Sequence, residues 1–226
     1  MYPDGPPLER QRPYNEQWRC PRLVITQACG LDLFVTPAPI RAVSAPVFDL
    51  PDCPEGEYFS YLIGRPGRGV AAVNSLSSRS GCTALLAHAS PKSFLLTGSH
   101  RKSIQAVRED RADFASIDAV TWHLLERHEP DQLDGVTPVD RTASATAPPY
   151  VVRNGSNGDV TTRLRSAMSD PATVLARRAL LIRGVKPVRR NDYADTKVEY
   201  ERVRSLIPSE RSIYRSYGQH VKVRRF

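Results

Sequence analysis

Residues 70–118 decide the fold of this protein, and they read VAAVNSLSSRSGCTALLAHASPKSFLLTGSHRKSIQAVREDRADFASID. Short apolar runs, which are typical of buried strands, alternate here with longer stretches whose apolar residues recur at helical spacing. We expect strands at 70–74, 94–97, 112–116 and 136–139, with a helix after each of the first three, the last one opening at Asp118. The order β-α-β-α-β-α-β over residues 70–141 predicts an α/β fold whose parallel sheet is covered by helices.

The pattern is less regular on both sides of this unit. Upstream, β-branched and aromatic runs predict strands at 23–26, 33–35, 42–43 and 58–63, and residues 1–19 are expected to be irregular because prolines interrupt them. Downstream of Pro148 and Pro149 we expect helices at 160–168 and 171–181. Ser169 or Asp170 would cap the second of these helices, and Gly184 would end it.

Hydroxyl residues follow three of the predicted strands, at 74–81, 97–100 and 116–118. In a parallel sheet, ligands bind beyond the carboxyl ends of the strands, where the next helices begin. Helix N-termini offer unpaired N–H groups and a partial positive charge, so three of them together suit a tetrahedral oxyanion without Lys or Arg. Ser, Thr and Asp are also ordinary helix caps, which is the alternative role for any one junction.

His100 and Asp118 are the titratable residues of these junctions. His100 would donate a hydrogen bond to an oxyanion from its neutral ring, or it is an exposed residue of a first helical turn. Asp118 would accept a proton from a phosphate or face an amine on a phosphonate, or it only caps its helix. No GxSxG, Cys–His or GxxxxGK[ST] motif occurs, so we predict no catalytic residues, and this pair is the one candidate for acid–base catalysis.

The formal net charge of +8 raises the question of nucleic-acid binding. Residues 182–226 hold 12 Lys and Arg against five Asp and Glu, so +7 of the excess lies in the last fifth of the chain. We interpret 206–226 as a solvated basic tail, because no zinc-finger or RNA-recognition motif accompanies it. The sequence therefore predicts no nucleic-acid partner.

Cysteine spacing and hydropathy exclude further classes of protein. The four cysteines lack CxxC spacing and no histidines have metal-site spacing, so we predict no metal and no cofactor. Cys29 and Cys53 would form a disulfide in an exported protein, with isolated thiols as the alternative. No apolar run approaches the roughly 18 residues of a membrane-spanning helix, so no membrane insertion is expected. The N-terminus lacks the apolar stretch of a signal peptide, which keeps a cytoplasmic location open.

Several of these segments together resemble a known family. VN at 73–74 with SG at 80–81, TGSH at 97–100 and ADFASID at 112–118 are similar to the phosphate, phosphite and phosphonate substrate-binding proteins of ABC transporters. TQACG at 26–30 and PPY at 148–150 also resemble that family. The resemblance covers residues 23–184, and it is strongest over 74–118.

This resemblance implies a type II periplasmic-binding-protein fold, in which two α/β lobes joined by two crossing segments close on the ligand. Residues 20–66 and 146–205 would form lobe 1, and residues 67–145 would form lobe 2, with crossings near 58–65 and 145–152. Compared with the family, a strand and a long helix are missing before Arg19. We therefore expect an N-terminally truncated, incomplete first lobe.

The resemblance also implies a set of ligand-binding residues. Ser78, Ser80 and Gly81 would hold the oxyanion, and Ser99 and His100 would complete the cradle. Gln27 and Asp118 would contact the ligand from the two sides of the cleft.

We therefore predict a solute-binding protein, not an enzyme, that delivers phosphate, phosphite or a phosphonate to an ABC permease. By the resemblance it would be monomeric and periplasmic. An enzyme of the same fold acting on a phosphorylated small molecule is one alternative. A cytoplasmic effector-sensing domain is another, although the helix-turn-helix of such regulators is missing from the sequence.

Overall fold

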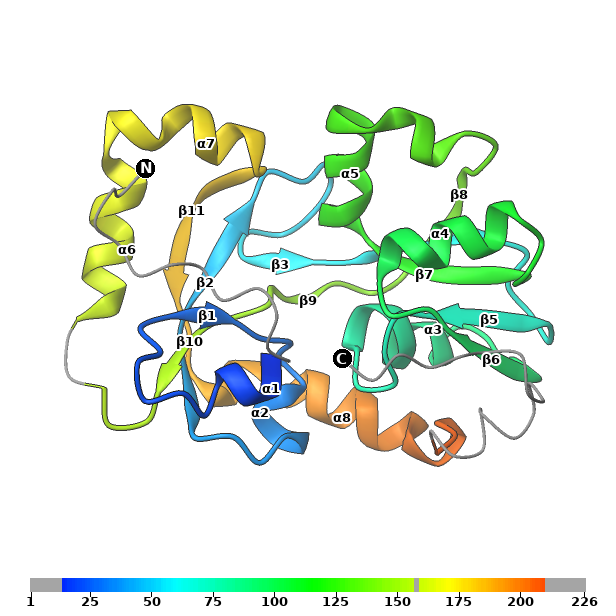
Figure 1. Ribbon diagram of the computed structural model, residues 1–226, viewed down its shortest axis with the longest axis horizontal. Coiled ribbons are helices and arrows are strands. Elements are labelled where there is room, and N and C mark those ends of the chain that lie inside the picture. Colours follow the sequence, from blue (N-terminus) through cyan, green and yellow to red (C-terminus); the bar gives the residue numbers. More distant parts are fainter. Residues whose placement is uncertain (1–13, 157–158, 210–226) are drawn as a thin grey trace.

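The computed structural model describes residues 14–156 and 159–209 (Figure 1). Within these residues, two larger sheets lie on either side of a short two-stranded sheet, which is formed by β3 (Glu57–Tyr58) and β9 (Ala145–Thr146). One larger sheet has the strand order β1-β10-β2-β11, and the other has the order β6-β5-β7-β4-β8. The chain is therefore an α/β protein with helices packed around mixed sheets, as the sequence predicted.

The five-stranded sheet is built around residues 70–118. β5 (Val70–Val73), β6 (Ser93–Leu96) and β7 (Phe114–Asp118) run parallel to one another, with β5 in the middle. The connections contain η1 (Arg79–Thr83), α3 (Ala84–Leu86) and α4 (His100–Arg108), and α5 (Ala119–His128) follows β7. The prediction of parallel strands that alternate with helices is thus confirmed for the first three strands.

The fourth predicted strand runs in the same direction as the first three, but it does not pair with any of them because β4 lies between β7 and β8. β8 (Pro138–Arg141), which follows α5 and η2 (Pro130–Leu133), pairs antiparallel with β4 (Ser60–Gly64). β4 is itself antiparallel to β7 and occupies the position beside it that a fourth parallel strand would need. The chain can therefore add a strand only outside β4, where all four residues of β8 are exposed.

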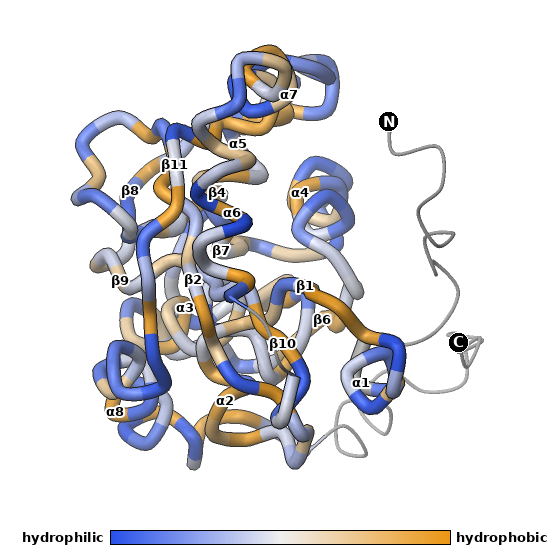
Figure 2. Tube along the Cα trace, turned by 90° about the vertical axis from the view of Figure 1, so that its left-hand side faces the viewer, coloured by the Kyte–Doolittle hydropathy of each residue, from blue (hydrophilic) through white to orange (hydrophobic). Residues whose placement is uncertain are grey.

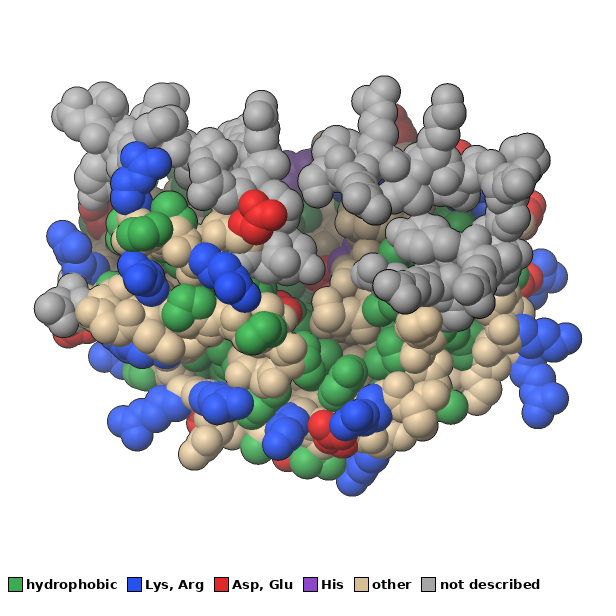
Figure 3. All heavy atoms as spheres, turned by 60° about the horizontal axis from the view of Figure 1, so that its bottom comes forward, with side chains coloured by type: hydrophobic (Ala, Val, Ile, Leu, Met, Phe, Trp, Pro, Cys, Tyr) green, Lys and Arg blue, Asp and Glu red, His purple; other side chains and the backbone are tan. Residues whose placement is uncertain are grey.

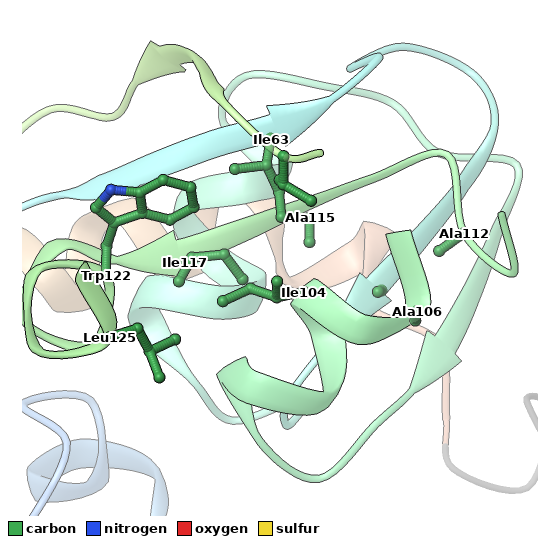
Figure 4. Close-up of a cluster of buried hydrophobic side chains, with 10 residues drawn as sticks. Ile63, Ile104, Ala106, Ala112, Ala115, Ile117, Trp122 and Leu125 are labelled. Carbon is green, nitrogen blue, oxygen red and sulfur yellow. The ribbon is translucent and has the colours of Figure 1, made fainter. Parts of the chain in front are cut away.

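Helices α4 and α5 pack their apolar side chains against one face of this sheet (Figure 4). Ile63 and Ile117 on the strands are completely buried, as is nearly all of Ile104 on α4. Trp122 and Leu125 of α5 complete the same cluster. This packing fixes the N-termini of α4 and α5 near the carboxyl ends of the parallel strands.

The four-stranded sheet is antiparallel throughout. Its strands are β1 (Thr26–Gln27), β10 (Tyr150–Arg153), β2 (Ile40–Phe48) and β11 (Ile182–Pro187). Around it lie four helices and a short 3-10 turn, η3: α1 (Tyr14–Gln17), α2 (Asp32–Val35), α6 (Val160–Ser169), η3 (Pro171–Thr173) and α7 (Val174–Ala179). In Figure 2 hydrophobic residues recur along β2, whereas β11 carries hydrophilic residues among its hydrophobic ones.

Three expectations for this region were wrong. Residues 33–35 form α2 rather than a strand, because the Asp32 carboxylate accepts hydrogen bonds from the Cys29 N–H and the Thr36 hydroxyl and closes a helical turn. Gly184 lies inside β11, and the preceding helix ends instead near Leu181, which adopts a positive φ of 57°. Residues 14–17, expected to be irregular, form α1.

The C-terminal part of the described chain returns to the second sheet. η4 (Arg190–Tyr193), α8 (Ala194–Val203) and η5 (Arg204–Leu206) run below both sheets in Figure 1. Val203 packs with buried residues of β5, α3 and β7.

Because β4 also belongs to the second sheet, we propose that the second lobe begins at β4 rather than at residue 67. The predicted tail lies outside the described residues from 210 onward. In the described part of the chain no helix is both long and apolar enough to cross a bilayer.

The buried cluster of α4, α5 and the second sheet makes a stability prediction. Ile117→Ala removes completely buried methyl groups, so we expect the free energy of unfolding to fall by about 2–5 kcal/mol. The matched control is Val139→Ala on the exposed strand β8, where Val139 is 56% exposed and the change should stay within about 0.5 kcal/mol. Urea denaturation followed by circular dichroism measures both values, and equal losses in the two variants would contradict this packing.

Candidate functional site: a cradle between the two sheets

A cavity of about 410 Å³ lies between the two larger sheets. The first lobe, the crossing strand β3 and the second lobe all contribute to its lining. The lining residues are Trp18, Gln27, Ala28, Cys29, Asp32 and Pro148 from the first lobe, Tyr58 from β3, and Asn74, Ser75, Ser77, Ser78, Ser80 and Gly98 from the second. The cavity therefore brings together segments that are more than 100 residues apart in the chain.

The second-lobe side of the cavity is the edge at which the parallel strands end. β5, β6 and β7 are neighbours and run in the same direction, so the junctions at Asn74, Thr97–Ser99 and Asp118 meet there. The sequence prediction that these three junctions share one edge is correct.

The loop from Ser78 to Gly81 is held in place by its own hydroxyl groups and by β7. The Ser78 Oγ accepts a hydrogen bond from the Gly81 N–H at 3.1 Å and lies 3.3 Å from the Ser80 Oγ. The buried Ser116 hydroxyl donates to the Ser80 carbonyl at 2.6 Å. Two serine hydroxyls are thus fixed at the cavity wall, where they are able to donate to an oxyanion.

Gly81 does not line the cavity, but it permits the close packing behind it. A Cβ at this position would lie 1.8 Å from Asn74 Oδ1 and 3.1 Å from His100 Cε1. Asn74 Oδ1 is buried and has no hydrogen-bond partner among the described residues. Asn74 also lines the cavity, so a ligand that reached its unpaired oxygen would meet a hydrogen-bond acceptor there.

His100 and Asp118 lie directly behind Ser80. The Nε2 atom of His100 is 3.1 Å from the Ser80 Oγ and 3.2 Å from Asp118 Oδ2. Burial lowers the pKa of the His100 ring, although the Asp118 carboxylate acts in the opposite direction, so the imidazole is neutral at neutral pH. Asp118 also caps α5 by accepting hydrogen bonds from the N–H and the hydroxyl of Thr121, so the interpretation of Asp118 as a helix cap is correct.

Of the remaining two predicted residues, Ser99 lies outside the cavity and Gln27 lines it. The Ser99 side chain caps α4 by accepting from the Lys102 N–H, and it lines a separate groove on the outer side of that helix. Gln27 lines the cavity from the first lobe, where its amide donates to the Pro148 carbonyl at 3.0 Å. The structure thus brings all the predicted residues together except Ser99, and Gly81, His100 and Asp118 support the wall rather than form it.

Asp32, Cys29 and Tyr58 were not predicted as site residues. Asp32 is the one side chain of the cavity lining that can carry a negative charge at neutral pH, and burial raises the pKa of its carboxyl. Burial also raises the pKa of the Cys29 thiol and of the Tyr58 hydroxyl, so both stay protonated. Cys29 and Cys53 are free thiols, so no disulfide joins them. Nothing in the local sequence pairs Asp32 with a loop about 45 residues downstream; only the fold does.

Two lobes with a polar cavity between them define this chain as a type II periplasmic-binding protein in fold. PA3383 from Pseudomonas aeruginosa, a binding protein component of an ABC phosphonate transporter, superposes with a TM-score of 0.66 at 14% identity over 87% of this chain and 74% of that one. PhnD1 from Prochlorococcus marinus, solved with methylphosphonate, gives 0.64 at 13% over 84% and 82%. XAC2383 from Xanthomonas citri, solved with ATP, gives 0.59 at 18% over 86% and 84%.

The family follows from the sequence match. Residues 74–193, more than half of the chain, match the family of periplasmic phosphonate substrate-binding proteins of ABC transporters. The protein belongs to this family, as its resemblance predicted. The family is periplasmic, and its members are binding proteins. Comparison with curated proteins gives no match.

Packing at Gly81 predicts the effect of adding one methyl group. Gly81→Ala would push Asn74 and His100 away from the Ser78–Ser80 loop, so we expect a loss of about 1–3 kcal/mol in unfolding free energy. The control is Gly67→Ala, because a Cβ at Gly67 meets nothing within 4 Å. Thermal denaturation of both variants tests this; an unchanged melting temperature for Gly81→Ala would contradict the packing.

The lowered pKa of His100 predicts a pH dependence of stability. The unfolded chain takes up a proton near the ordinary histidine pKa of about 6.5, whereas the folded chain does so only at lower pH. The folded state therefore loses stability as pH falls from about 6.5 towards the folded pKa. His100→Gln should show a smaller loss between pH 7.5 and 5.5 than the wild type in urea denaturation, while the exposed-site control His88→Gln should follow the wild type.

Proposed function

We propose that this protein binds a phosphonate monoanion in the cavity between its lobes and delivers it to an ABC permease in the periplasm. The observation that carries the proposal is the convergence of the Ser78 and Ser80 hydroxyls, backed by the neutral His100 ring, at the carboxyl edge of three parallel strands. This arrangement supplies hydrogen-bond donors to phosphonate oxygens without a formal positive charge.

Charge at the cavity supports a ligand of low net negative charge. Among the described residues, no Lys, Arg or His lines the cavity, whereas Asp32 does, and Asp118 lies behind Ser80. A dianion would meet these carboxylates without a compensating cation. A monoanion retains a P–OH group that can donate to Asn74 Oδ1, and an aminoalkyl phosphonate also offers an ammonium group to Asp32.

Cavity size supports an organic substituent on phosphorus. The cavity volume of about 410 Å³ falls in the range of small-molecule pockets. Phosphate or phosphite, with five atoms, would fill only a part of this cavity. A nucleotide is less well supported, even though XAC2383 was solved with ATP. The triphosphate would bring several negative charges to a lining whose described residues include no Lys or Arg.

The contacts of His100 speak against catalysis by this cluster. In a proton-relaying triad, the nucleophile and the carboxylate bind opposite nitrogens of the ring. Here Ser80 and Asp118 both contact Nε2, so the ring cannot take a proton from the serine while it is oriented by the carboxylate through Nδ1. We therefore propose a binding protein without catalytic activity.

Closure of the two lobes would complete the site. Gln27 and Asp32 approach the ligand from the first lobe, and Ser78 and Ser80 approach it from the second. A ligand that contacts both walls stabilises the closed state by the contacts that the open state lacks. Trp18 lines the cavity, so its fluorescence is a suitable reporter of this closure.

A ligand screen with paired variants tests this function. We expect 2-aminoethylphosphonate and methylphosphonate to raise the melting temperature and to change Trp fluorescence more than phosphate, phosphite, sulfate or ATP. Ser80→Ala should weaken phosphonate binding about tenfold or more in calorimetry, because it removes a hydrogen bond to a charged ligand. The control Ser90→Ala changes an exposed serine and should bind as the wild type does.

Asp32→Asn separates the two parts of the proposal. It should reduce the affinity for 2-aminoethylphosphonate more than that for methylphosphonate, since only the former has an ammonium group. A cooperative melt with no response to any phosphonate would overturn the proposed function, and equal losses for both ligands would overturn the role of Asp32.

A further inference from the structure

A second groove, of about 600 Å³, lies on the outer side of the first lobe. It is bounded by α2, the beginning of β2, the chain after β10 and the beginning of η4. Its lining residues are Leu33, Phe34, Thr36, Ala38, Ile40, Arg41, Ala42, Asn154, Arg189 and Arg190, none of which lines the cavity between the lobes. We refer to it as the outer groove.

The outer groove combines an apolar floor with a cationic rim. Phe34 and Ile40 are half-buried in the floor. The Arg190 guanidinium lies 4.9 Å from the centre of the Phe34 ring, and the Lys197 ammonium lies 5.9 Å from it. Both distances are within the range of cation–π contacts, so the aromatic ring holds two cations at the edge of the groove.

The positive charge of this rim is not compensated by the described residues. Arg41, Arg189, Arg190 and Lys197 form no ion pair within residues 14–156 and 159–209. No carboxylate lines the groove, and the nearby Asp192 accepts its hydrogen bond from the backbone N–H of Arg189. Arg190 and Lys197 share the Phe34 ring, so their like charges repel one another, and a bound anion would relieve that repulsion.

The rim depends on the fold, because its cations come from distant parts of the sequence. Arg41 lies on β2, whereas Arg189, Arg190 and Lys197 belong to the basic segment after residue 182. Part of the charge excess of residues 182–226 is therefore folded against α2. Figure 3 brings forward the face that carries α2 and α8, where Lys and Arg side chains lie beside hydrophobic ones and an acidic side chain lies among them.

We propose that the outer groove binds an amphipathic organic anion of small-molecule size that carries at least two negative charges. The guanidinium groups of Arg41 and Arg190 match the paired oxygens of a phosphate or carboxylate. The floor around Phe34 receives the apolar body of the same molecule. This site is chemically opposite to the cavity between the lobes, which has hydroxyl donors and no cation, and it does not depend on the ligand proposed for that cavity.

Calorimetry on the full chain at low ionic strength tests this site, with 1-naphthyl phosphate as the probe. Inorganic phosphate supplies the charge without the apolar body, and 1-naphthol supplies the body without the charge. We expect 1-naphthyl phosphate to bind at least tenfold more tightly than either. Arg41→Gln and Arg190→Gln should each weaken its binding about tenfold, as expected for the loss of a charged hydrogen bond.

Two further variants locate the binding. Arg178→Gln removes the same charge from an exposed position on α7 and should leave the affinity unchanged. Ser80→Ala alters the cavity between the lobes and should also have no effect on this probe. Unchanged binding in both Arg41→Gln and Arg190→Gln, equal loss in Arg178→Gln, or loss in Ser80→Ala alone would each overturn the proposal, as would binding of inorganic phosphate with equal affinity.

Discussion

The hydrogen bond from the buried Ser116 hydroxyl to the Ser80 carbonyl is the contact on which the site depends. It ties the loop after β5 to the end of β7, so the two strand ends share one rigid edge. Ser80 then places its own hydroxyl between Ser78 and His100, and Asp118 holds the ring from behind. Without this anchor, the hydroxyls that face the cavity would have no fixed position relative to each other, and an oxyanion would have to order them on binding.

The side chain of Arg79, in the same loop, points away from the cavity and contacts other parts of the protein. Whereas Ser78 and Ser80 face the cavity, the side chain of Arg79 is 2% exposed and donates to Glu199 on α8 and to the Ala143 carbonyl near the second crossing. Its guanidinium also lies over the Tyr58 ring of the first crossing, and its backbone N–H contacts the Cys29 sulfur of the first lobe. One short loop thus contacts both crossing segments and both lobes. A ligand bound to that loop would therefore lie beside the segments that connect the lobes.

The cavity between the lobes and the outer groove differ in that the first offers hydrogen bonds and the second offers charge. The cavity between the lobes offers hydroxyls and a neutral histidine, so its recognition depends on geometry and disfavours ligands of high charge. The outer groove offers guanidinium groups that form no ion pair with the described residues, and they lie beside an aromatic floor. A net charge of +8 therefore says little about the cavity between the lobes, since no Lys or Arg within residues 14–156 and 159–209 lines it.

The sequence by itself determined the parallel β5, β6 and β7, the helices after them and the hydroxyl residues at their ends, because strand periodicity and helix capping are local properties. It also determined the family, through segments such as TGSH at 97–100. Only the tertiary structure decided that the antiparallel strand β4 lies between β7 and β8, that Ser99 faces away from the cavity, and that Asp32, Cys29 and Tyr58 line it. The physical reason is that these outcomes depend on which distant segments pack against one another. Strand pairing and cavity walls are contacts between residues far apart in the chain, and no local sequence pattern specifies them.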